Sequence, residues 1–370
     1  MCLRDFFVIL LATKIGSSRM NKDENRVKRK IFQILFPILS LVLSSWFLIE
    51  NTEPHSCTIF TAVQGETVLY GDNFDYHEGE LVIGFFPSSA EGYGSVHFGF
   101  TNGEGQSFSR VVNDHGLAWA VNSIPKAKLN PHTEKRYSHA KDNYVYTISK
   151  RAATVEEAIQ LAKEFNFGES FEVQIHIADA SGDAVVLGPG RDGEIAFTRK
   201  PTGDGYLLST NFNRAIPENG PVDFRWEVGN SMLEKLGESQ TLTPKYAAEI
   251  LEAVHLRTLT THTLYSNVSD LKNGDIYIHY MSQYNETMKL NIAEELAKGQ
   301  RVVEARSLFS TETAGAGDAS YYRFETRFFS AIAGVILTGI ILISGLVLII
   351  TRRVRRHKVF EIINNNHKGG

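Results

Sequence analysis

Uncharged apolar stretches stand near both ends of the chain, and shorter alternating patterns fill the part between them. Ile31–Ile49 is nineteen residues without a charge and follows a basic cluster. Phe328–Thr351 is twenty-four residues without a charge and precedes a second basic cluster. At about 1.5 Å per residue, the second stretch can cross a hydrocarbon core of about 30 Å as a helix. The pattern predicts a signal peptide or signal anchor at the first stretch and a transmembrane helix at the second.

The basic clusters predict how the chain is oriented in the membrane. Positively charged flanks stay in the cytoplasm, and one cluster precedes its apolar stretch while the other follows its own. The part between them is therefore expected outside the cytoplasm, anchored in the cell membrane. A buried core helix is the alternative for either stretch. The predicted division is a leader at 1–56, an outward domain at 57–309, a stalk at 310–327, a membrane helix at 328–351 and a basic cytoplasmic tail at 352–370.

Strand-like and helix-like patterns alternate within the outward domain. Phe171–Ala178 alternates strictly and is followed by a turn, which predicts a strand. A capping box at Thr154 opens a helix to about Phe165, and Thr243-Pro244 opens another to about Val254. Strands in pairs with helices between them indicate an α+β layered domain. The other predicted elements are a hairpin of Cys57–Val63 with Thr67–Gly71, strands at Ala184–Leu187, Asp275–Met281 and Thr287–Ile292, and helices at Trp226–Leu236 and Ile292–Lys298.

The charge of the chain is unevenly distributed. The 370 residues carry a formal net charge of −4, but the leader carries +3 and residues 328–370 carry +5, which leaves −12 for residues 57–327. An acidic outward domain disfavours nucleic acid as a partner. Two cysteines in the whole chain exclude a disulfide-stapled scaffold and a Cys-rich zinc module. The histidines show no metal-ligand spacing and no phosphate loop is present, so neither metal nor cofactor is predicted.

Cys57 becomes the one cysteine of the outward domain if the leader is removed. Translation can start at Met1 or at Met20, which decides whether the other cysteine exists. Three interpretations of Cys57 compete: a buried structural residue, a lipid-attachment site, and an N-terminal nucleophile. Cleavage between Ser56 and Cys57 would free an α-amine with a pKa of about 7.7–8.0. Such an amine can act as general base for its own thiol without a histidine.

The motifs around Cys57 resemble a known family. Cys57-Thr58-Ile59-Phe60 and the later Gly71-Asp72-Asn73-Phe74-Asp75 are similar to the opening of the choloylglycine hydrolase and penicillin V acylase family of N-terminal nucleophile amidohydrolases. This family includes isopenicillin-N acyltransferase-like and acid-amidase relatives. Further blocks keep the family's order and spacing over roughly 57–310. They are Asn113-Asp114-His115-Gly116-Leu117-Ala118 with Val121-Asn122, Asp179-Ala180-Ser181-Gly182-Asp183, Ser209-Thr210-Asn211-Phe212, Arg225-Trp226, and Thr263-Leu264-Tyr265-Ser266-Asn267 with Asp270.

The resemblance implies a role for each of five residues. Cys57 would be nucleophile and, through its amine, base, while Asp75 would hold that amine by a charge-assisted hydrogen bond. Asn122 and Asn211 would offer N–H groups to the oxyanion of the tetrahedral intermediate. Arg225 would stabilise the charged centre near the thiolate. Each of the last four also has a structural alternative, as a turn, strand-end or helix-start residue.

One position departs from the family. The family usually carries an arginine before Asn73, beside the thiol, and this chain carries Asp72. An acidic neighbour raises the pKa of a thiol instead of lowering it. His77 could compensate, although a loop histidine is more often merely exposed. The departure puts bile-salt and penicillin-type substrates in doubt.

The fold implied by the resemblance is a four-layer αββα sandwich, with two antiparallel sheets between helical layers. The implied reaction is hydrolysis of a linear amide C–N bond in a small N-acyl compound through an acyl-enzyme on Cys57. An acyltransferase of the same fold and a catalytically degenerate surface binding protein are the alternatives. The sequence leaves open whether the Ser56–Cys57 bond is cut by signal peptidase, by another protease or by the domain itself.

Overall fold

The computed structural model describes residues 57–76, 80–102, 105–135, 137–138, 144–219, 223–258 and 261–366. The chain divides into two compact units, of which the larger spans Glu53–Phe328. All the described strands belong to this larger unit, since they lie between Thr58 and Glu304. The predicted leader, including the apolar stretch at 31–49, lies outside the described residues, as does His77.

Six antiparallel strands form the first sheet, in the spatial order β12-β1-β2-β13-β14-β15. Its interior includes the hairpin of β1 and β2, which pairs Thr58 with Asn73 and turns between Gln64 and Thr67. This hairpin places the residue before β1, Cys57, next to the middle of the sheet instead of at an edge. The strands are β1 (Thr58–Gln64), β2 (Thr67–Tyr76), β12 (Gly205–Ser209), β13 (His262–Asp270), β14 (Asp275–Tyr280) and β15 (Gln283–Asn291).

Eight antiparallel strands form the second sheet, in the spatial order β11-β10-β9-β6-β5-β4-β3-β16. Its members are β3 (Glu80–Phe86), β4 (Ser95–Asn102), β5 (Gly105–Asn113), β6 (Ala118–Lys128), β9 (Ser170–Ala178), β10 (Ala184–Pro189), β11 (Ile195–Arg199) and β16 (Arg301–Glu304). A separate short parallel pair joins β7 (Tyr137–Ser138) to β8 (Phe165–Asn166).

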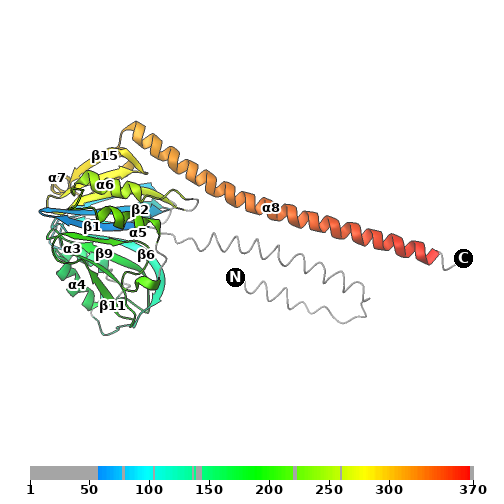
Figure 1. The fold of residues 1–370 in the computed structure, drawn as a ribbon, viewed down its shortest axis with the longest axis horizontal. Coiled ribbons are helices and arrows are strands. Elements are labelled where there is room, and N and C mark those ends of the chain that lie inside the picture. Colours follow the sequence, from blue (N-terminus) through cyan, green and yellow to red (C-terminus); the bar gives the residue numbers. More distant parts are fainter. Residues whose placement is uncertain are drawn as a thin grey trace. The chain divides into compact units, whose positions relative to one another are not determined.

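Helices cover the outer face of each sheet, and apolar side chains fill the layers between (Figure 1). Residues of the first sheet such as Phe60 pack with Ile250 of the helical layer. Residues of the second sheet such as Trp119 pack with Ile148 and Ile159. A third cluster lies between the two sheets and includes Cys57. The helices are α3 (Tyr144–Arg151), α4 (Val155–Glu164), α5 (Phe224–Leu233), α6 (Pro244–Ala253), α7 (Ile292–Ala297) and α8 (Thr311–Asn366), with short 3-10 turns at Pro217–Asn219 and Ala305–Leu308.

The layered αββα fold implied by the motifs is thus confirmed. The helices with the clearest capping signals were predicted to within a residue of their start. Thr154 caps α4 and accepts from the backbone N–H of Glu157, whose side chain completes the capping box. Thr243 caps α6 and accepts from the backbone N–H of Tyr246, with Pro244 in the first turn. These signals are local, so no tertiary knowledge is needed to read them.

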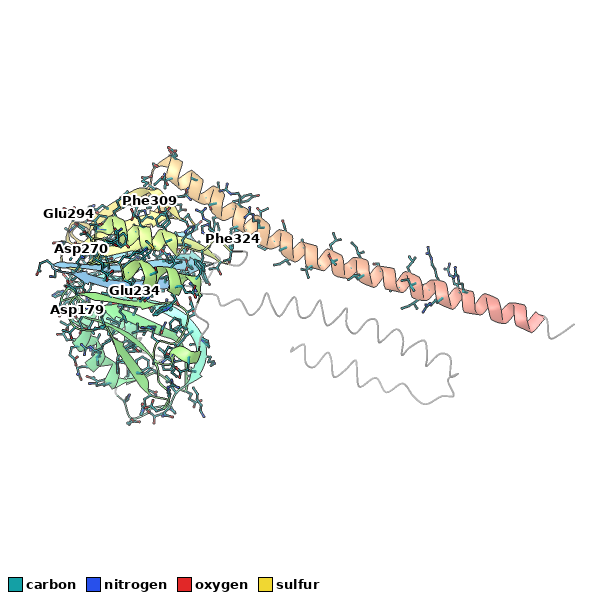
Figure 2. All side chains as sticks on the ribbon, viewed as in Figure 1. Asp179, Glu234, Asp270, Glu294, Phe309 and Phe324 are labelled. Carbon is teal, nitrogen blue, oxygen red and sulfur yellow. The ribbon has the colours of Figure 1, made fainter. Side chains whose placement is uncertain are left out.

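The stretch predicted as a stalk is helical from Thr311 onward. Its first turns pack on the first sheet: Tyr280 donates to Asp318 at 3.0 Å, and His262 Nε2 lies 3.2 Å from the hydroxyl of Ser320. Phe309 and Phe324, both labelled in Figure 2, are buried there. Within the described residues, the segment Thr311–Arg353 of α8 is long and apolar enough to cross a membrane.

Candidate active site

Cys57 is buried directly before β1, with 1% of its surface exposed. Its neighbours come from both sheets: Asp72 and Asp75 on β2 of the first, and Arg110 on β5 of the second. Burial is the largest effect on the thiol and raises its pKa, while the guanidinium of Arg110 opposes that shift. Cys57 therefore sits where the two sheets face each other, in an environment whose charges decide its ionisation.

Asp75 is fully buried and lies between a hydroxyl donor and a guanidinium. Thr263 on β13 donates to Asp75 Oδ1. The other oxygen, Oδ2, lies 3.6 Å from Nη1 of Arg225 and has no hydrogen bond among the described residues. Burial raises the pKa of Asp75 to about 7, with Arg225 opposing the shift. Asp75 and Arg225, which were predicted from separate motifs, are thus brought together, and Oδ2 of Asp75 can still accept a hydrogen bond.

The raised pKa of Asp75 predicts a pH-dependent stability in a chain that retains residues before Cys57. The pKa of Asp75 is about 3.9 in the unfolded chain and about 7 in the folded chain. At a pH between these two values, Asp75 holds a proton in the native state and releases it on unfolding. This contribution to the free energy of unfolding is present below about pH 4 and lost as the pH rises to 7. Asp75→Asn should remove this pH dependence of the free energy of unfolding. The measurement is the denaturant midpoint of each protein at pH 4.5 and at pH 7. An identical pH dependence in both proteins would contradict the buried, protonated state.

Asn122 on β6 points its amide at the backbone of Cys57. Its Nδ2 donates to the Cys57 carbonyl at 2.8 Å, and its Oδ1 accepts from the hydroxyl of Ser209 at 2.9 Å. Because Ser209 donates its proton to Asn122, its oxygen accepts from Nδ1 of His176, 2.9 Å away. Nε2 of His176 then accepts from the Thr61 hydroxyl at 2.9 Å. Burial lowers the pKa of His176 to about 3, so the imidazole is neutral, as this chain of donors requires.

The Ser209→Ala variant tests this chain. We expect it to lower the free energy of unfolding by about 1–3 kcal/mol, because it leaves His176 Nδ1–H and Asn122 Oδ1 buried without a partner. The measurement is urea denaturation at neutral pH. Ser307→Ala, at an exposed serine, is the control and should stay within about 0.5 kcal/mol of the unchanged protein. Equal stabilities of the two variants would show that the chain of hydrogen bonds contributes nothing.

Asn211 lies next to this chain of hydrogen bonds. Its Nδ2 donates to the backbone carbonyl of Ser123, the residue after Asn122, at 2.8 Å. Asn122 and Asn211 are thus neighbours through Ser123, but their side-chain amides face different carbonyl groups. Both amides would have to meet a substrate oxygen to act as the predicted oxyanion donors.

The motifs that contain Asn113 and Asp179 form hydrogen bonds with the backbone of turns and of a helix start. Asn113 accepts from the backbone N–H of Leu117 at 2.9 Å and so closes the turn between β5 and β6. Asp179 accepts from the backbone N–H of Val155 at 2.7 Å, at the start of α4, and from that of Ser181 at 2.8 Å. These motifs hold turns and helix starts of the fold.

Arg110 is the residue at the thiol that the sequence analysis missed. Its Nη2 lies 2.7 Å from Cys57 Sγ, and its Nε donates to Asp72 Oδ1 at 2.8 Å. The Asp72 carboxylate, whose pKa is raised by burial, also accepts from Nδ2 of Asn267 at 2.6 Å. The acidic residue that departs from the family pattern is therefore the ion-pair partner of an arginine from the opposite sheet.

A β-bulge sets the direction of Arg110. Phe98 on β4 pairs with Arg110 and the next residue, Gly99, pairs with Phe108, so Ser109 is an extra residue in β5. A bulge of this kind re-aims the side chains beside it. Phe108 then packs against Phe86 and His97, whereas Arg110 reaches Cys57. A Cβ at Gly99 would collide with the carbonyl oxygen of Ser107, so the bulge also explains this glycine.

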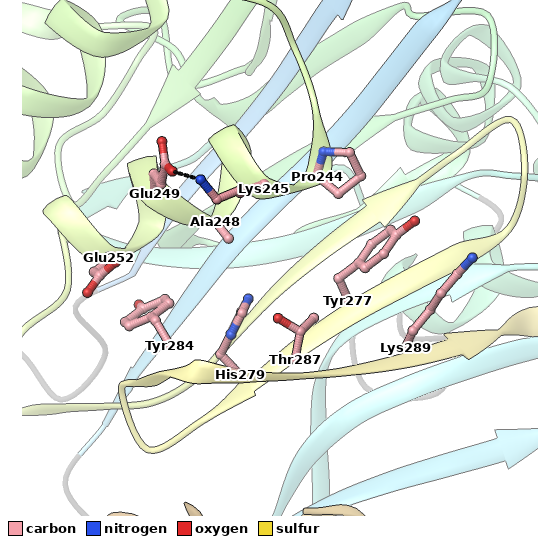
Figure 3. A pocket seen from close by; sticks show the side chains of 10 residues that line it. All are labelled: Pro244, Lys245, Ala248, Glu249, Glu252, Tyr277, His279, Tyr284, Thr287 and Lys289. Atoms are coloured by element: carbon pink, nitrogen blue, oxygen red, sulfur yellow. Dashed lines mark ion pairs between the residues drawn. The ribbon is translucent and has the colours of Figure 1, made fainter.

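A cavity of about 610 Å³ lies elsewhere, between α6 and the strands β14 and β15 (Figure 3). Its lining includes Tyr277, His279 and Tyr284, with an ion pair of Lys245 and Glu249 at 3.0 Å on the helix side. None of the predicted site residues lines it. The candidate active site is therefore the buried cluster at Cys57, separate from this cavity.

Among solved structures, the chain is similar to penicillin V acylase from Agrobacterium tumefaciens, with a TM-score of 0.51 and 16% identity over 66% of this chain and 90% of that chain. The described domain has the fold of that acylase. A mutant conjugated bile acid hydrolase from Clostridium perfringens also matches, with a TM-score of 0.48 and 15% identity over 67% of this chain and 95% of that chain. No family model matches the chain, and no curated protein matches it. The acylase match confirms the fold implied by the motifs, and the chemistry is argued from the site.

Proposed function

We propose that the outward domain is an amidohydrolase that cleaves linear amide C–N bonds of small N-acyl compounds with Cys57 as its N-terminal nucleophile. The observation that carries this proposal is the position of Cys57 in the acylase fold. It directly precedes the interior strand β1, with Asp75, Asn122 and Arg110 gathered around it. The proposal adds that the Ser56–Cys57 bond is cut, by the domain itself or by a protease, so that Cys57 carries a free α-amine.

The proposed reaction uses that amine as its base. The amine takes the thiol proton, and the Cys57 sulfur attacks the substrate carbonyl to form a tetrahedral intermediate. The protonated amine then gives its proton to the leaving nitrogen, the C–N bond breaks, and an S-acyl enzyme remains. Water, deprotonated by the amine, attacks this thioester, the C–S bond breaks and the carboxylic acid is released. The protonated amine returns its proton to the departing Cys57 thiolate, which restores the thiol and the free amine. No cofactor takes part in any of these steps.

The surrounding residues have positioning and electrostatic roles. Asp75 Oδ2, which has no hydrogen bond among the described residues, accepts from the α-amine, and Arg225 keeps the carboxylate oriented. Asn122 fixes the Cys57 backbone through its bond to the carbonyl. N–H groups of Asn122 and Asn211 donate to the oxyanion, a contribution of about 3–4 kcal/mol per donor in other enzymes.

The substrate class follows from the reaction and from the solved neighbours. One of these is named a penicillin V acylase and the other a conjugated bile acid hydrolase. By analogy, the substrate here is a small acylated amine or amino acid whose acyl group is transferred to Cys57.

The enzyme is proposed to be anchored in the cell membrane by α8 with its domain outside the cytoplasm. The uncharged stretch Phe328–Thr351 and the basic residues after it support this orientation. The leader then serves as the signal peptide that exports the domain.

Product analysis tests the proposed function. The full chain, purified from membranes in detergent, is incubated with N-acyl derivatives of 7-amino-4-methylcoumarin of increasing acyl length. We expect equal amounts of fluorescent amine and free acid for at least one acyl length. Absence of both products in a chain that begins at Cys57 would overturn the hydrolase assignment.

A further inference from the structure

Arg110, Asp72 and Asn267 form a buried polar group that reaches the thiol of Cys57 from the second sheet. We propose that Arg110 is the residue that stabilises the Cys57 thiolate, and that Asp72 is a positioning residue that holds Arg110 against the sulfur. This inference rests on the proposed function, since it assigns parts of the same site. It also assigns a positioning role to Asp72, the residue that stands where the family usually carries an arginine.

The guanidinium of Arg110 has a fixed orientation. Three of its nitrogens have separate partners: Nε donates to Asp72 at 2.8 Å, Nη1 to the hydroxyl of Ser109 at 2.5 Å, and Nη2 lies 2.7 Å from the sulfur of Cys57. The ring of Phe74 lies 4.3 Å from the guanidinium carbon. These contacts at three edges and one face of the planar guanidinium orient the N–H of Nη2 towards the sulfur.

The Nη2 group of Arg110 faces the sulfur of Cys57, and the Asp72 carboxylate contacts a different nitrogen of the guanidinium. Asp72 contacts Nε, on a different edge of the guanidinium from the nitrogen at the thiol. Asn267 donates to the second carboxylate oxygen at 2.6 Å and so prevents Asp72 from turning towards Cys57. Arg110 and Asp72 are 2% and 1% exposed. At such burial, an ion pair without additional hydrogen bonds would cost more than it returns.

The ion pair spans the two sheets, because Asp72 lies on β2 and Arg110 on β5. A role confined to joining the sheets would need only the carboxylate and guanidinium. It would not need the third edge of the guanidinium to meet a thiol at hydrogen-bond distance. The bulge at Ser109 turns Arg110 into the space between the sheets, where Cys57 lies.

Several titratable groups act on the thiol besides this pair. Burial raises the pKa of Cys57, Arg110 lowers it, and Asp75 and Asp72 raise it, Asp72 least of those named. Arg225 acts on the cluster through Asp75. Arg110 is the strongest single charge acting on the thiol. The groups that face this cluster are Cys57, Tyr70, Asp72, Asp75, Arg110, Arg225 and Tyr265.

The test follows the ionisation of Cys57 without any substrate. The full chain, shown by intact mass to begin at Cys57, is alkylated with iodoacetamide between pH 5 and pH 10. Arg110→Gln should move the pH midpoint of alkylation upward by about 1–3 units, the size expected for loss of an adjacent opposite charge. Arg110→Lys keeps the charge but not the fork, and should recover part of that shift. Arg199→Gln, at an exposed arginine paired with Asp183 and Glu156, is the matched control and should leave the midpoint unchanged.

Asp72→Asn separates positioning from simple charge repulsion. A carboxylate that acts only through its field would, on removal, lower the alkylation midpoint and speed the reaction. A carboxylate that positions Arg110 should instead, when replaced, raise the midpoint and lower kcat at least about tenfold with KM little changed. Circular dichroism spectra matching the unchanged chain are required of every variant.

The outcomes distinguish this inference from the proposed function. A raised alkylation midpoint in Arg110→Gln supports the role of Arg110 even if no N-acyl amide is hydrolysed, in which case the proposed function alone fails. An active enzyme in which Arg110→Gln leaves both midpoint and kcat unchanged would overturn the role of Arg110. A lowered midpoint with increased kcat in Asp72→Asn would overturn the positioning role of Asp72.

Discussion

We expect Cys57→Ala to abolish hydrolysis of N-acyl amides, with a loss of at least about 10⁴ in kcat, the size seen when a covalent nucleophile is removed from other hydrolases. The reason is that Cys57 is the one cysteine among the described residues, and the nearby Ser209 hydroxyl accepts from Nδ1 of His176, so this histidine cannot take its proton. Cys57 is a free cysteine, and the thiol lies within the charged cluster of Asp75 and Arg110. The measurement is release of fluorescent amine and of free acid by the full chain.

Cys57→Ser is the informative companion variant. It keeps an α-amine and a hydroxyl at the same position, so cleavage before residue 57 can still be assessed by mass. Its hydroxyl is far less acidic than a thiol and should react slowly. Full activity in Cys57→Ala would refute the assignment of the nucleophile, whatever the behaviour of the serine variant.

The second large effect is expected at Asp75. Asp75→Asn should lower kcat by about 10²–10³, because the amide can no longer accept a charge-assisted hydrogen bond from the α-ammonium of Cys57 and compensate its charge. Asp75 is buried, and its Oδ2 lies 3.6 Å from Arg225. An exposed carboxylate therefore cannot replace Asp75 as the acceptor for the α-ammonium. Steady-state kinetics of the processed chain give the measurement, with pH profiles to follow the amine.

Asp192→Asn is the control for this variant, since Asp192 is exposed in a turn of the second sheet. It should retain the activity of the unchanged chain. Retention of full activity by Asp75→Asn in a correctly processed chain would show that the α-amine needs no acidic partner. It would also make Asp75 a structural residue bonded to Thr263.

The sequence predicted the elements whose signals are local. The caps at Thr154 and Thr243 and the alternation of Phe171–Ala178 each lie within one segment, and the structure has α4, α6 and β9 at those places. The order of strands in each sheet depends on contacts between distant segments. It could be inferred only through the resemblance of the motifs to a known family.

The sequence did not predict Arg110, for a physical reason. Strict alternation along β5 would place Phe108 and Arg110 on the same face, but the extra residue Ser109 reverses the pattern. Gly99 on the neighbouring strand was the available signal, and a single glycine does not identify a bulge partner. Asp72 was correctly recognised as unusual, but its meaning depends on a residue thirty-eight positions away.

Motif similarity alone also did not distinguish residues at the candidate site from residues that hold turns and helix starts of the fold. Asn122 and Asp179 both belong to blocks that resemble the family. Asn122 donates to the Cys57 carbonyl, whereas Asp179 accepts from the backbone at the start of α4. The structure places four predicted residues, Cys57, Asp75, Asn122 and Arg225, in one buried cluster. Asn211 is linked to it through Ser123.

The N-terminus of the purified protein tests the central proposal most directly. Intact mass and N-terminal sequencing of the membrane-extracted chain should show that it begins at Cys57. After brief exposure to an active N-acyl amide and acid quenching, its mass should increase by one acyl group on that residue. A chain that hydrolyses amides while retaining Ser56, or that carries the acyl group elsewhere, would contradict catalysis by an N-terminal cysteine.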